Sequence, residues 1–235
     1  MNVAFRPGWV LPHLALSGLT AAIVASSPLG ALHLPSIPFP FASAPIEPGE
    51  LSNQPVVPPA PPFVLHANDL TDARQATRCL AQAVYYEAGF QPVEGQRAIA
   101  QVILNRVRDR NFPGTVCGVV YEGWRRRTGC QFSFVCDGSL SRRPPTADEL
   151  QSAEKIALDA LSGYVVAAVG TATHYHTWRI DPYWNDTLVK TAQIGDHIFY
   201  RWPGKAGQPQ ALRDERYDGA EVAAARRSPH QAMLG

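Results

Sequence analysis

Apolar residues between positions 70 and 88 recur at helical spacing, which is the first clear pattern along the 235-residue chain. Thr71 is a residue type that caps helices, and Gly89 is a type that ends them. The inward stripe of this predicted helix, at positions i, i+3, i+4 and i+7, consists of Leu80, Ala83, Val84 and Glu87. The pattern therefore places a carboxylate, Glu87, where a helix ordinarily buries methyl groups.

Two more helices follow from the same kind of pattern. The segment from Pro92 to Arg108 is apolar around much of its circumference, which predicts a central helix. Its polar residues need partners inside the protein; they are Gln101, Asn105 and Arg106. A third helix is expected from Thr146, where TADE has the spacing of a capping box, to Gly163.

The period of the apolar positions changes to two in three later segments, residues 131–135, 172–178 and 197–202. In the first of them, QFSFV, Phe132 and Phe134 fall on one face. The three segments predict a small antiparallel sheet. Because helices dominate and strands cluster late, the predicted class is α+β.

Composition divides the chain into four parts. Residues 1–26 contain an apolar run preceded by a single side-chain cation, which predicts a signal peptide or a membrane anchor. About half of the 21 prolines lie in residues 27–68, which predicts an extended linker. Residues 69–203 are long enough for one catalytic domain with its own core, and residues 204–235, without a sustained apolar period, predict a flexible tail.

Charge and cysteine content narrow the class of protein. A formal net charge of +1 argues against nucleic acid as a partner. The four cysteines include no CxxC pair, which favours two disulfides in an exported protein over a zinc site; they are Cys79, Cys117, Cys130 and Cys136. Four cysteines allow three pairings, and the sequence leaves all three open.

Glu87 has two interpretations. A buried carboxylate is costly unless it is paired, so Glu87 could form an internal ion pair with Arg106 or Arg97. Alternatively, the inward face is the wall of a cleft, and apolar surroundings raise the pKa of Glu87 toward neutrality, as a general acid requires. Aromatic side chains that suit sugar rings support the cleft; they are Tyr85, Tyr86, Tyr175, Tyr183, Trp178 and Trp184.

Five linked motifs occur in order, from AVYYEA with EGQRAIAQVILNRV through FPGTVCGVVYEG, CQFSFVCDG and ATHYHT to QIGDHIFYR. Together they cover about residues 78–201 and resemble the cell wall hydrolase family typified by the spore cortex-lytic enzymes SleB and CwlJ. The resemblance implies a fold like that of lysozymes and lytic transglycosylases, and activity on peptidoglycan glycan strands. It also implies that Glu87 is the catalytic glutamate.

The chain departs from the family pattern directly after Glu87. Where the family commonly has Arg-Gly-Glu, this chain has Gly89, Phe90 and Gln91. The departure predicts altered substrate contacts beside a retained catalytic residue.

A glycosidase with two carboxylates needs a second Asp or Glu, and Glu94, Glu122 and Asp137 are available. Glu94 is better explained by the helix dipole, and Asp137 by an Asp-Gly turn. A scheme with Glu87 alone resembles that of lytic transglycosylases, which cleave the bond between N-acetylmuramic acid and N-acetylglucosamine without a cofactor. The substrate-binding residues expected with it are Tyr86, Gln131, Ser133, His174, Tyr175 and Trp184.

Two other functions stay open. His174 and His176 lie two apart on a predicted strand and so share a face, which with Asp181 or Asp186 would suit a metal-dependent N-acetylmuramoyl amidase. The Gly89–Gln91 departure is also compatible with a peptidoglycan-binding module that has lost its active site. In each case the expected partner is peptidoglycan, and the expected location is the periplasm or cell envelope, at the inner membrane if residues 1–26 are an anchor.

Overall fold

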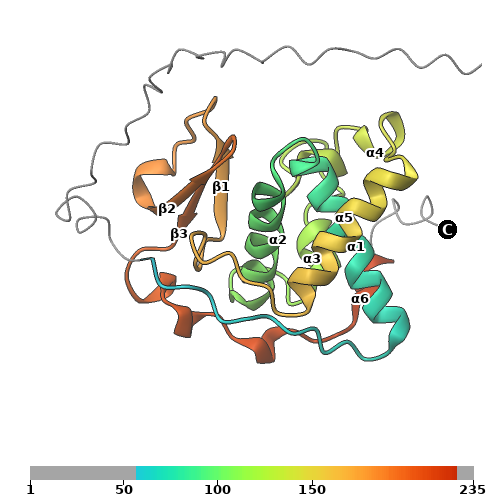
Figure 1. Ribbon diagram of the computed structural model, residues 1–235, viewed down its shortest axis with the longest axis horizontal. Coiled ribbons are helices and arrows are strands. Elements are labelled where there is room, and N and C mark those ends of the chain that lie inside the picture. Colours follow the sequence, from blue (N-terminus) through green and yellow to red (C-terminus); the bar gives the residue numbers. More distant parts are fainter. Residues whose placement is uncertain (1–56, 227–235) are drawn as a thin grey trace, which may run out of the picture. The chain divides into compact units, whose positions relative to one another are not determined.

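The computed structural model describes residues 57–226, which fold as one unit of helices and a small sheet (Figure 1). The α-helices are α1 (Leu70–Ala88), α2 (Val93–Arg108), α3 (Val116–Val120), α4 (Ser139–Arg142), α5 (Ala147–Leu161) and α6 (Glu221–Ala225). The strands are β1 (His174–Thr177), β2 (Val189–Ile194) and β3 (His197–Arg201). Five 3-10 helices connect these elements: Ser133–Val135, Asn185–Thr187, Gly204–Gly207, Pro209–Ala211 and Asp214–Arg216. The predicted α+β class is confirmed.

The cap of helix α1 lies two residues before the predicted one, Thr71. The carboxylate of Asp69, rather than the hydroxyl of Thr71, caps it by accepting the backbone N–H groups of Thr71 and Asp72 at 2.7 and 2.8 Å. Helix α5 begins as predicted, with the capping box between Thr146 and Glu149. Local hydrogen bonds at the termini therefore set where both helices start.

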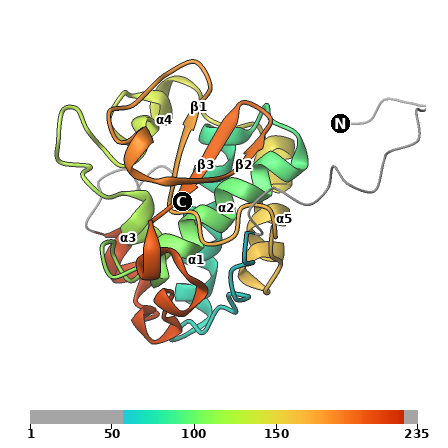
Figure 2. The same ribbon diagram turned by 90° about the vertical axis from the view of Figure 1, so that its left-hand side faces the viewer.

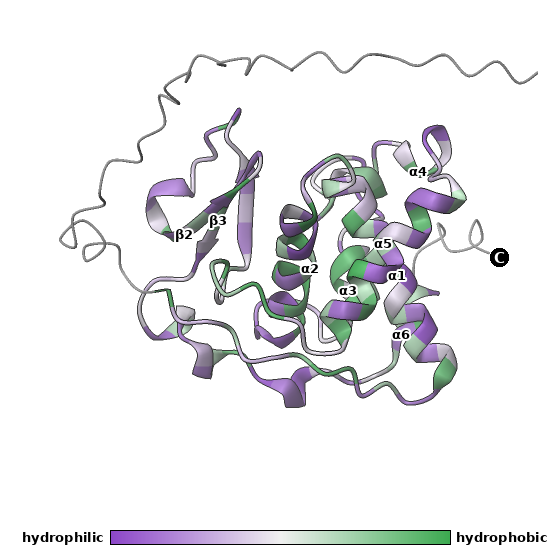
Figure 3. Cartoon of the chain, in the orientation of Figure 1, coloured by the Kyte–Doolittle hydropathy of each residue, from purple (hydrophilic) through white to green (hydrophobic). Residues whose placement is uncertain are grey.

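Helix α2 is the central element, as predicted, and lies between the sheet and the remaining helices (Figure 1). Apolar residues on the facing sides of α1, α2, α3 and α5 form much of the core (Figure 3). The polar residues of α2 do find internal partners. The amide of Asn105 donates to the carbonyl oxygens of Gly170 and Ala172 at 2.9 and 2.8 Å, and Nε of Arg106 donates to the carbonyl oxygen of Thr173 at 2.7 Å. These bonds hold the segment that leads into β1 against α2.

The sheet is antiparallel with strand order β1-β3-β2, and Figure 2 shows its three strands in front of α2. The predicted strands at 172–178 and 197–202 correspond to β1 and β3, whose register pairs Tyr175 with Phe199. Strand β2 has no counterpart among the predicted strands.

The prediction of a strand at residues 131–135 is wrong, because Ser133–Val135 is a 3-10 helix. A disulfide between Cys130 and Cys136 gives the reason. An extended segment would separate these two Cα atoms by roughly 20 Å at about 3.3 Å per residue, whereas they lie 6.2 Å apart. The alternating pattern comes instead from Phe132 and Phe134 reaching the core from a closed loop.

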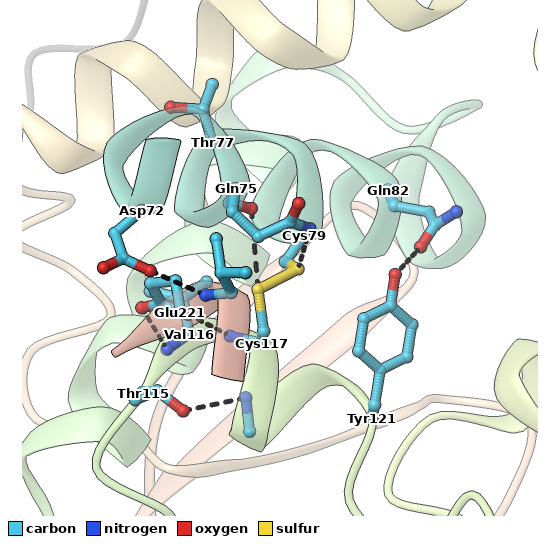
Figure 4. Close-up of a disulfide and its surroundings, with 12 residues drawn as sticks. Asp72, Gln75, Thr77, Cys79, Gln82, Thr115, Val116, Cys117, Tyr121 and Glu221 are labelled. Atoms are coloured by element: carbon cyan, nitrogen blue, oxygen red, sulfur yellow. Dashed lines mark hydrogen bonds between the residues drawn. A yellow bond between two sulfur atoms is a disulfide. The ribbon is translucent and has the colours of Figure 1, made fainter. Parts of the chain in front are cut away.

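The folded domain is longer than the predicted 69–203. Within the predicted linker, Ala60 and Phe63 are buried, and the guanidinium of Arg108 donates to the carbonyl oxygen of Pro61 at 2.9 Å. The flexible tail predicted from residue 204 is likewise contradicted for residues 204–226. There the carboxylate of Glu221 is fully buried and accepts the backbone N–H groups of Val116 and Cys117, both at 2.8 Å (Figure 4). Residues 227–235 lie outside the described part.

The second disulfide joins Cys79 of α1 to Cys117 of α3 (Figure 4), which decides among the three pairings that the sequence leaves open. Within residues 57–226, no helix is long and apolar enough to cross a membrane. The predicted signal or anchor at 1–26 and most of the linker lie outside the described residues.

Candidate active site

Glu87 lies in the last turn of α1 and lines an open cavity of about 320 Å³ between the helices and the sheet. The cavity walls come from α1, α2, the disulfide-closed loop, β1, the segment after it, and the start of β3. The lining residues are Glu87, Arg106, Gln131, Phe132, Ser133, His174, Tyr175, His176, Thr177, Ile180, Trp184 and His197. The inward face of α1 is therefore the wall of a cavity at Glu87, as the second interpretation of this residue requires.

The carboxylate of Glu87 is held by one side chain from the sheet. The phenolic hydroxyl of Tyr175 on β1 donates to Oε2 of Glu87 at 2.7 Å. No ion pair of Glu87 occurs within residues 57–226. Arg97 pairs instead with Glu94 and Asp159, at 3.8 and 3.4 Å, so the ion pair predicted for Glu87 is absent.

The surroundings of Glu87 favour its protonated form. Burial raises the pKa of Glu87, while the hydrogen bond from Tyr175 and the positive charge of Arg106 lower it; burial is the largest effect, and the net pKa lies above the ordinary value. A carboxyl group with a raised pKa retains its proton closer to neutral pH. Glu87 is thus suited to donate a proton.

Five of the six predicted substrate-binding residues line the same cavity: Gln131, Ser133, His174, Tyr175 and Trp184. Tyr86 does not. Its ring stacks on Phe134, with centroids 4.7 Å apart, and its hydroxyl donates to the carbonyl oxygen of Arg143 at 3.0 Å. Neighbouring positions on a helix point about 100° apart, so Tyr86 and Glu87 face different sides of α1.

Trp184 forms an aromatic wall of the cavity. Its ring contacts those of His174, His176 and Tyr200 at centroid distances of 5.4, 5.6 and 5.6 Å. Burial and the nearby charge of Arg106 lower the pKa of His174 to about 4, so this imidazole is neutral at neutral pH. The segment between β1 and Trp184 also exposes Trp178, Ile180 and Tyr183.

The metal alternative depends on His174 and His176, which share a face of β1 as predicted. Both ring nitrogens of His176 lie 2.9 Å from protein oxygens, the carbonyl of Thr177 and the hydroxyl of Tyr200. Nδ1 of His174 lies 3.0 Å from the hydroxyl of Thr173. In the described part of the chain, no three His, Cys, Asp or Glu side chains gather as a metal-ligand set. These histidines are hydrogen-bonded groups of the cavity wall.

Among the residues lining this cavity, all of which the structure describes, Glu87 is the one carboxylate. Glu94 lies in the first turn of α2, as predicted from the dipole, and Glu122 lines a separate cavity beside α3 and α6. Asp137 accepts the backbone N–H of Ser139 at 2.7 Å in a turn where Gly138 has a φ of 83°, which agrees with the predicted Asp-Gly turn.

Six cavity residues lie outside the predicted set of catalytic and substrate-binding residues: Arg106, Phe132, His176, Thr177, Ile180 and His197. Arg106 carries a signal in the sequence, because it is a charged residue in a helix that is apolar nearly all around. His197 carries none, since it reads as the first residue of a strand. Its ring packs edge-on against Tyr175, with centroids 5.2 Å apart.

Gln91, where the chain departs from the family pattern, joins the turn after α1 to the turn between β2 and β3. Its side-chain oxygen accepts the backbone N–H of Asp196 at 3.0 Å, and its side-chain nitrogen donates to the Asp196 carboxylate at 3.4 Å. A glutamate at this position would face the carboxylate of Asp196 without a donor. The amide therefore fits this partner.

The family model for Cell Wall Hydrolase matches residues 90–200, from the turn after Glu87 to the end of the sheet. The chain belongs to the cell wall hydrolase family. It is 37% identical over 123 residues to the spore cortex-lytic enzyme of Bacillus subtilis (strain 168), covering 52% of this chain and 36% of that protein. It is 36% identical over 121 residues to the spore cortex-lytic enzyme of Bacillus cereus, covering 51% of this chain and 42% of that protein. The chain thus spans about two fifths of the length of these relatives.

Two solved structures are also similar to this member of the family. The catalytic domain of the Bacillus cereus SleB protein is 33% identical, with 59% of this chain and 95% of that domain covered and a TM-score of 0.46. The catalytic domain of SleB from Bacillus anthracis, described as a germination-specific lytic transglycosylase, is 35% identical, with 55% and 95% covered and a TM-score of 0.44.

Proposed function

We propose that the chain is a cell wall glycosidase that cleaves the bond between N-acetylmuramic acid and N-acetylglucosamine in peptidoglycan as a lytic transglycosylase. One observation carries this proposal: the cavity presents a single carboxyl group, Glu87, with a raised pKa and a hydrogen bond from Tyr175. Membership of the cell wall hydrolase family supports the choice of substrate.

Glu87 acts twice in the proposed reaction. First, its carboxyl group donates a proton to the glycosidic oxygen, and the bond from that oxygen to C1 of the muramic residue breaks. The C6 hydroxyl oxygen of the same sugar then bonds to C1, while the Glu87 carboxylate takes the hydroxyl proton. The products are a 1,6-anhydro muramic end and a free N-acetylglucosamine hydroxyl, and Glu87 is again protonated.

Other residues of the cavity would hold the sugars. Gln131, Ser133 and His174 offer hydrogen bonds to N-acetyl groups and hydroxyls, and the ring of Trp184 offers a face against which a sugar can pack. The exposed Trp178 and Tyr183 would extend this surface along the glycan. Tyr86 could contribute only from outside the cavity.

We further propose that the chain is exported to the periplasm or cell envelope, with the apolar segment at 1–26 as a signal or an inner-membrane anchor. The two disulfides support an oxidising compartment.

Mass spectrometry of the soluble products from purified peptidoglycan tests the proposal, with the full chain compared with the Glu87→Gln variant. Anhydro-muramic ends from the wild type alone are expected. Reducing muramic ends would mean that water is the nucleophile. Released peptides with intact glycan would indicate an amidase, and glycan binding without any product would indicate a binding module. Wild-type turnover by a folded Glu87→Gln variant would refute the role of Glu87.

A further inference from the structure

We propose that Arg106 is a positioning residue of the Glu87 cavity, whose buried positive charge stabilises Glu87 as a carboxylate once it has given up its proton. This inference rests on the proposed function, because in that reaction Glu87 must stay a carboxylate until it takes the proton of the C6 hydroxyl.

Arg106 is buried and fixed in orientation. It is 4% exposed, and its Nε donates to the carbonyl oxygen of Thr173 at 2.7 Å. The guanidinium carbon lies 5.3, 5.4 and 5.8 Å from the ring centroids of Phe112, Phe132 and Tyr175. A guanidinium keeps its proton in proteins, so a full positive charge is held among these rings, where water screens it little.

The guanidinium of Arg106 has a hydrogen-bond donor without a partner in the described part of the chain. Within residues 57–226, Nη1 of Arg106 is buried and has no hydrogen-bond partner, and Arg106 forms no ion pair within 4.0 Å. An unpaired N–H of a buried cation is costly, so the site is arranged for a negative charge that the protonated state of Glu87 does not supply.

The arrangement of the two side chains explains why Glu87 can still hold a proton. Tyr175 contacts both side chains: its ring centroid lies 5.8 Å from the guanidinium carbon of Arg106, and its hydroxyl donates to the carboxyl group of Glu87. A direct ion pair with Arg106 would keep Glu87 ionised. Without Arg106, no buried positive charge would stabilise the carboxylate form of Glu87. Without a direct ion pair, the positive charge of Arg106 lowers the pKa of Glu87 but does not overcome the effect of burial.

Several other titratable groups surround the pair: Tyr175, His174 and His176 on β1, His197 on β3, and Glu122 and Asp137 in the segment between α3 and α4. Burial raises the pKa of Tyr175 well above its ordinary value and lowers those of His174 and His197, so these three are neutral near pH 7. Glu122 attracts the charge of Arg106, and Asp137 opposes ionisation of Glu87.

The direct test is an NMR titration of the full chain, observing the Arg106 guanidinium and the Glu87 carboxyl carbon. The Arg106→Lys and Glu87→Gln variants assign the two signals. We expect both signals to change through the same pH range in the wild type, and the guanidinium signal to lose that transition in Glu87→Gln. The inference would be overturned if the Arg106 signal did not change over the pH range in which Glu87 ionises. It would also be overturned if the Arg106 signal kept the same transition in Glu87→Gln. The titration needs no folded variant lacking the charge at position 106.

Kinetics provide the second test. In Arg106→Gln, the upper limit of the pH profile for release of anhydro-muropeptides should move to higher pH, and kcat should fall on the order of tenfold or more. Arg106→Lys, which keeps the charge, should restore the pH limit toward that of the wild type. A purely structural role would lower activity equally at every pH and would refute the proposal. If the Arg106 and Glu87 signals of the wild type change together but no anhydro ends form, the proposed function is refuted. The interaction between the two charges would then still be established.

Discussion

The hydroxyl of Tyr175 reaches Oε2 of Glu87 at 2.7 Å across 88 residues of sequence. It connects the last turn of the first helix to the first strand of the sheet. This contact therefore fixes the carboxyl group of Glu87 relative to the sheet.

Replacing Tyr175 with Phe should reduce release of muropeptides by about one to two orders of magnitude, because a hydrogen bond to an ionised group contributes about 1.5–3 kcal/mol. The hydrogen bond lowers the pKa of Glu87, so the upper limit of the pH profile should also move to higher pH. Tyr164→Phe is the matched control, since this exposed tyrosine contacts Arg97 away from the cavity. An unchanged rate and pH profile in Tyr175→Phe would show that the contact has no part in catalysis.

The two disulfides should differ in what they support. Cys79–Cys117 closes 38 residues and Cys130–Cys136 closes 6. Chain entropy then assigns them about 4 and about 2 kcal/mol of stability. Serine pairs at 79 and 117 should therefore lower Tm more, whereas serine pairs at 130 and 136 should lower cleavage more, because that loop carries Gln131 and Ser133 into the cavity. Calorimetry and muropeptide release check both, and the reverse order of effects would contradict this division.

Glu221 should make stability depend on pH. Burial raises the pKa of Glu221 from an ordinary 4.5 to about 7. Between these values the folded chain binds more protons than the unfolded chain, so the stabilisation is fully present below about pH 4.5 and is lost as pH rises through about 7. The change should amount to about 3 kcal/mol at most.

Urea unfolding at several pH values measures this dependence, in a Glu87→Gln background because Glu87 shifts in the same direction. Glu221→Gln should flatten the curve between pH 4.5 and 7. Glu215→Gln, an exposed carboxylate of the same segment, should not. A slope that survives in Glu221→Gln would assign the dependence to another group.

Truncation should show where the domain ends. A chain ending at residue 203 loses the Glu221 contacts to Val116 and Cys117 and the ion pair between Asp214 and Arg108. It should unfold at a lower temperature and be cleaved faster by protease than a chain ending at residue 226. Equal melting temperatures of the two chains would show that the domain ends near residue 203.

Much of the fold follows from local pattern. The stripe on α1, the all-round apolar character of α2 and the capping box of α5 each depend on residues within a few positions of one another. Strand β2 was not predicted because its residues are partly buried or exposed, without a clear alternation of buried and exposed positions. The prediction of a strand at 131–135 was wrong because a disulfide closes this segment into a loop.

The sequence by itself determined that Glu87 faces inward, that helices precede a small sheet, and that the family motifs occur in order. Periodicity and capping are local, so they can be read along the chain. The tertiary structure alone decided that Tyr175 holds Glu87, that Arg106 and His197 join the cavity while Tyr86 does not, which cysteines pair, and that residues 204–226 pack on the helices. These are contacts between distant segments, and they exist only once burial of the core has brought the segments together.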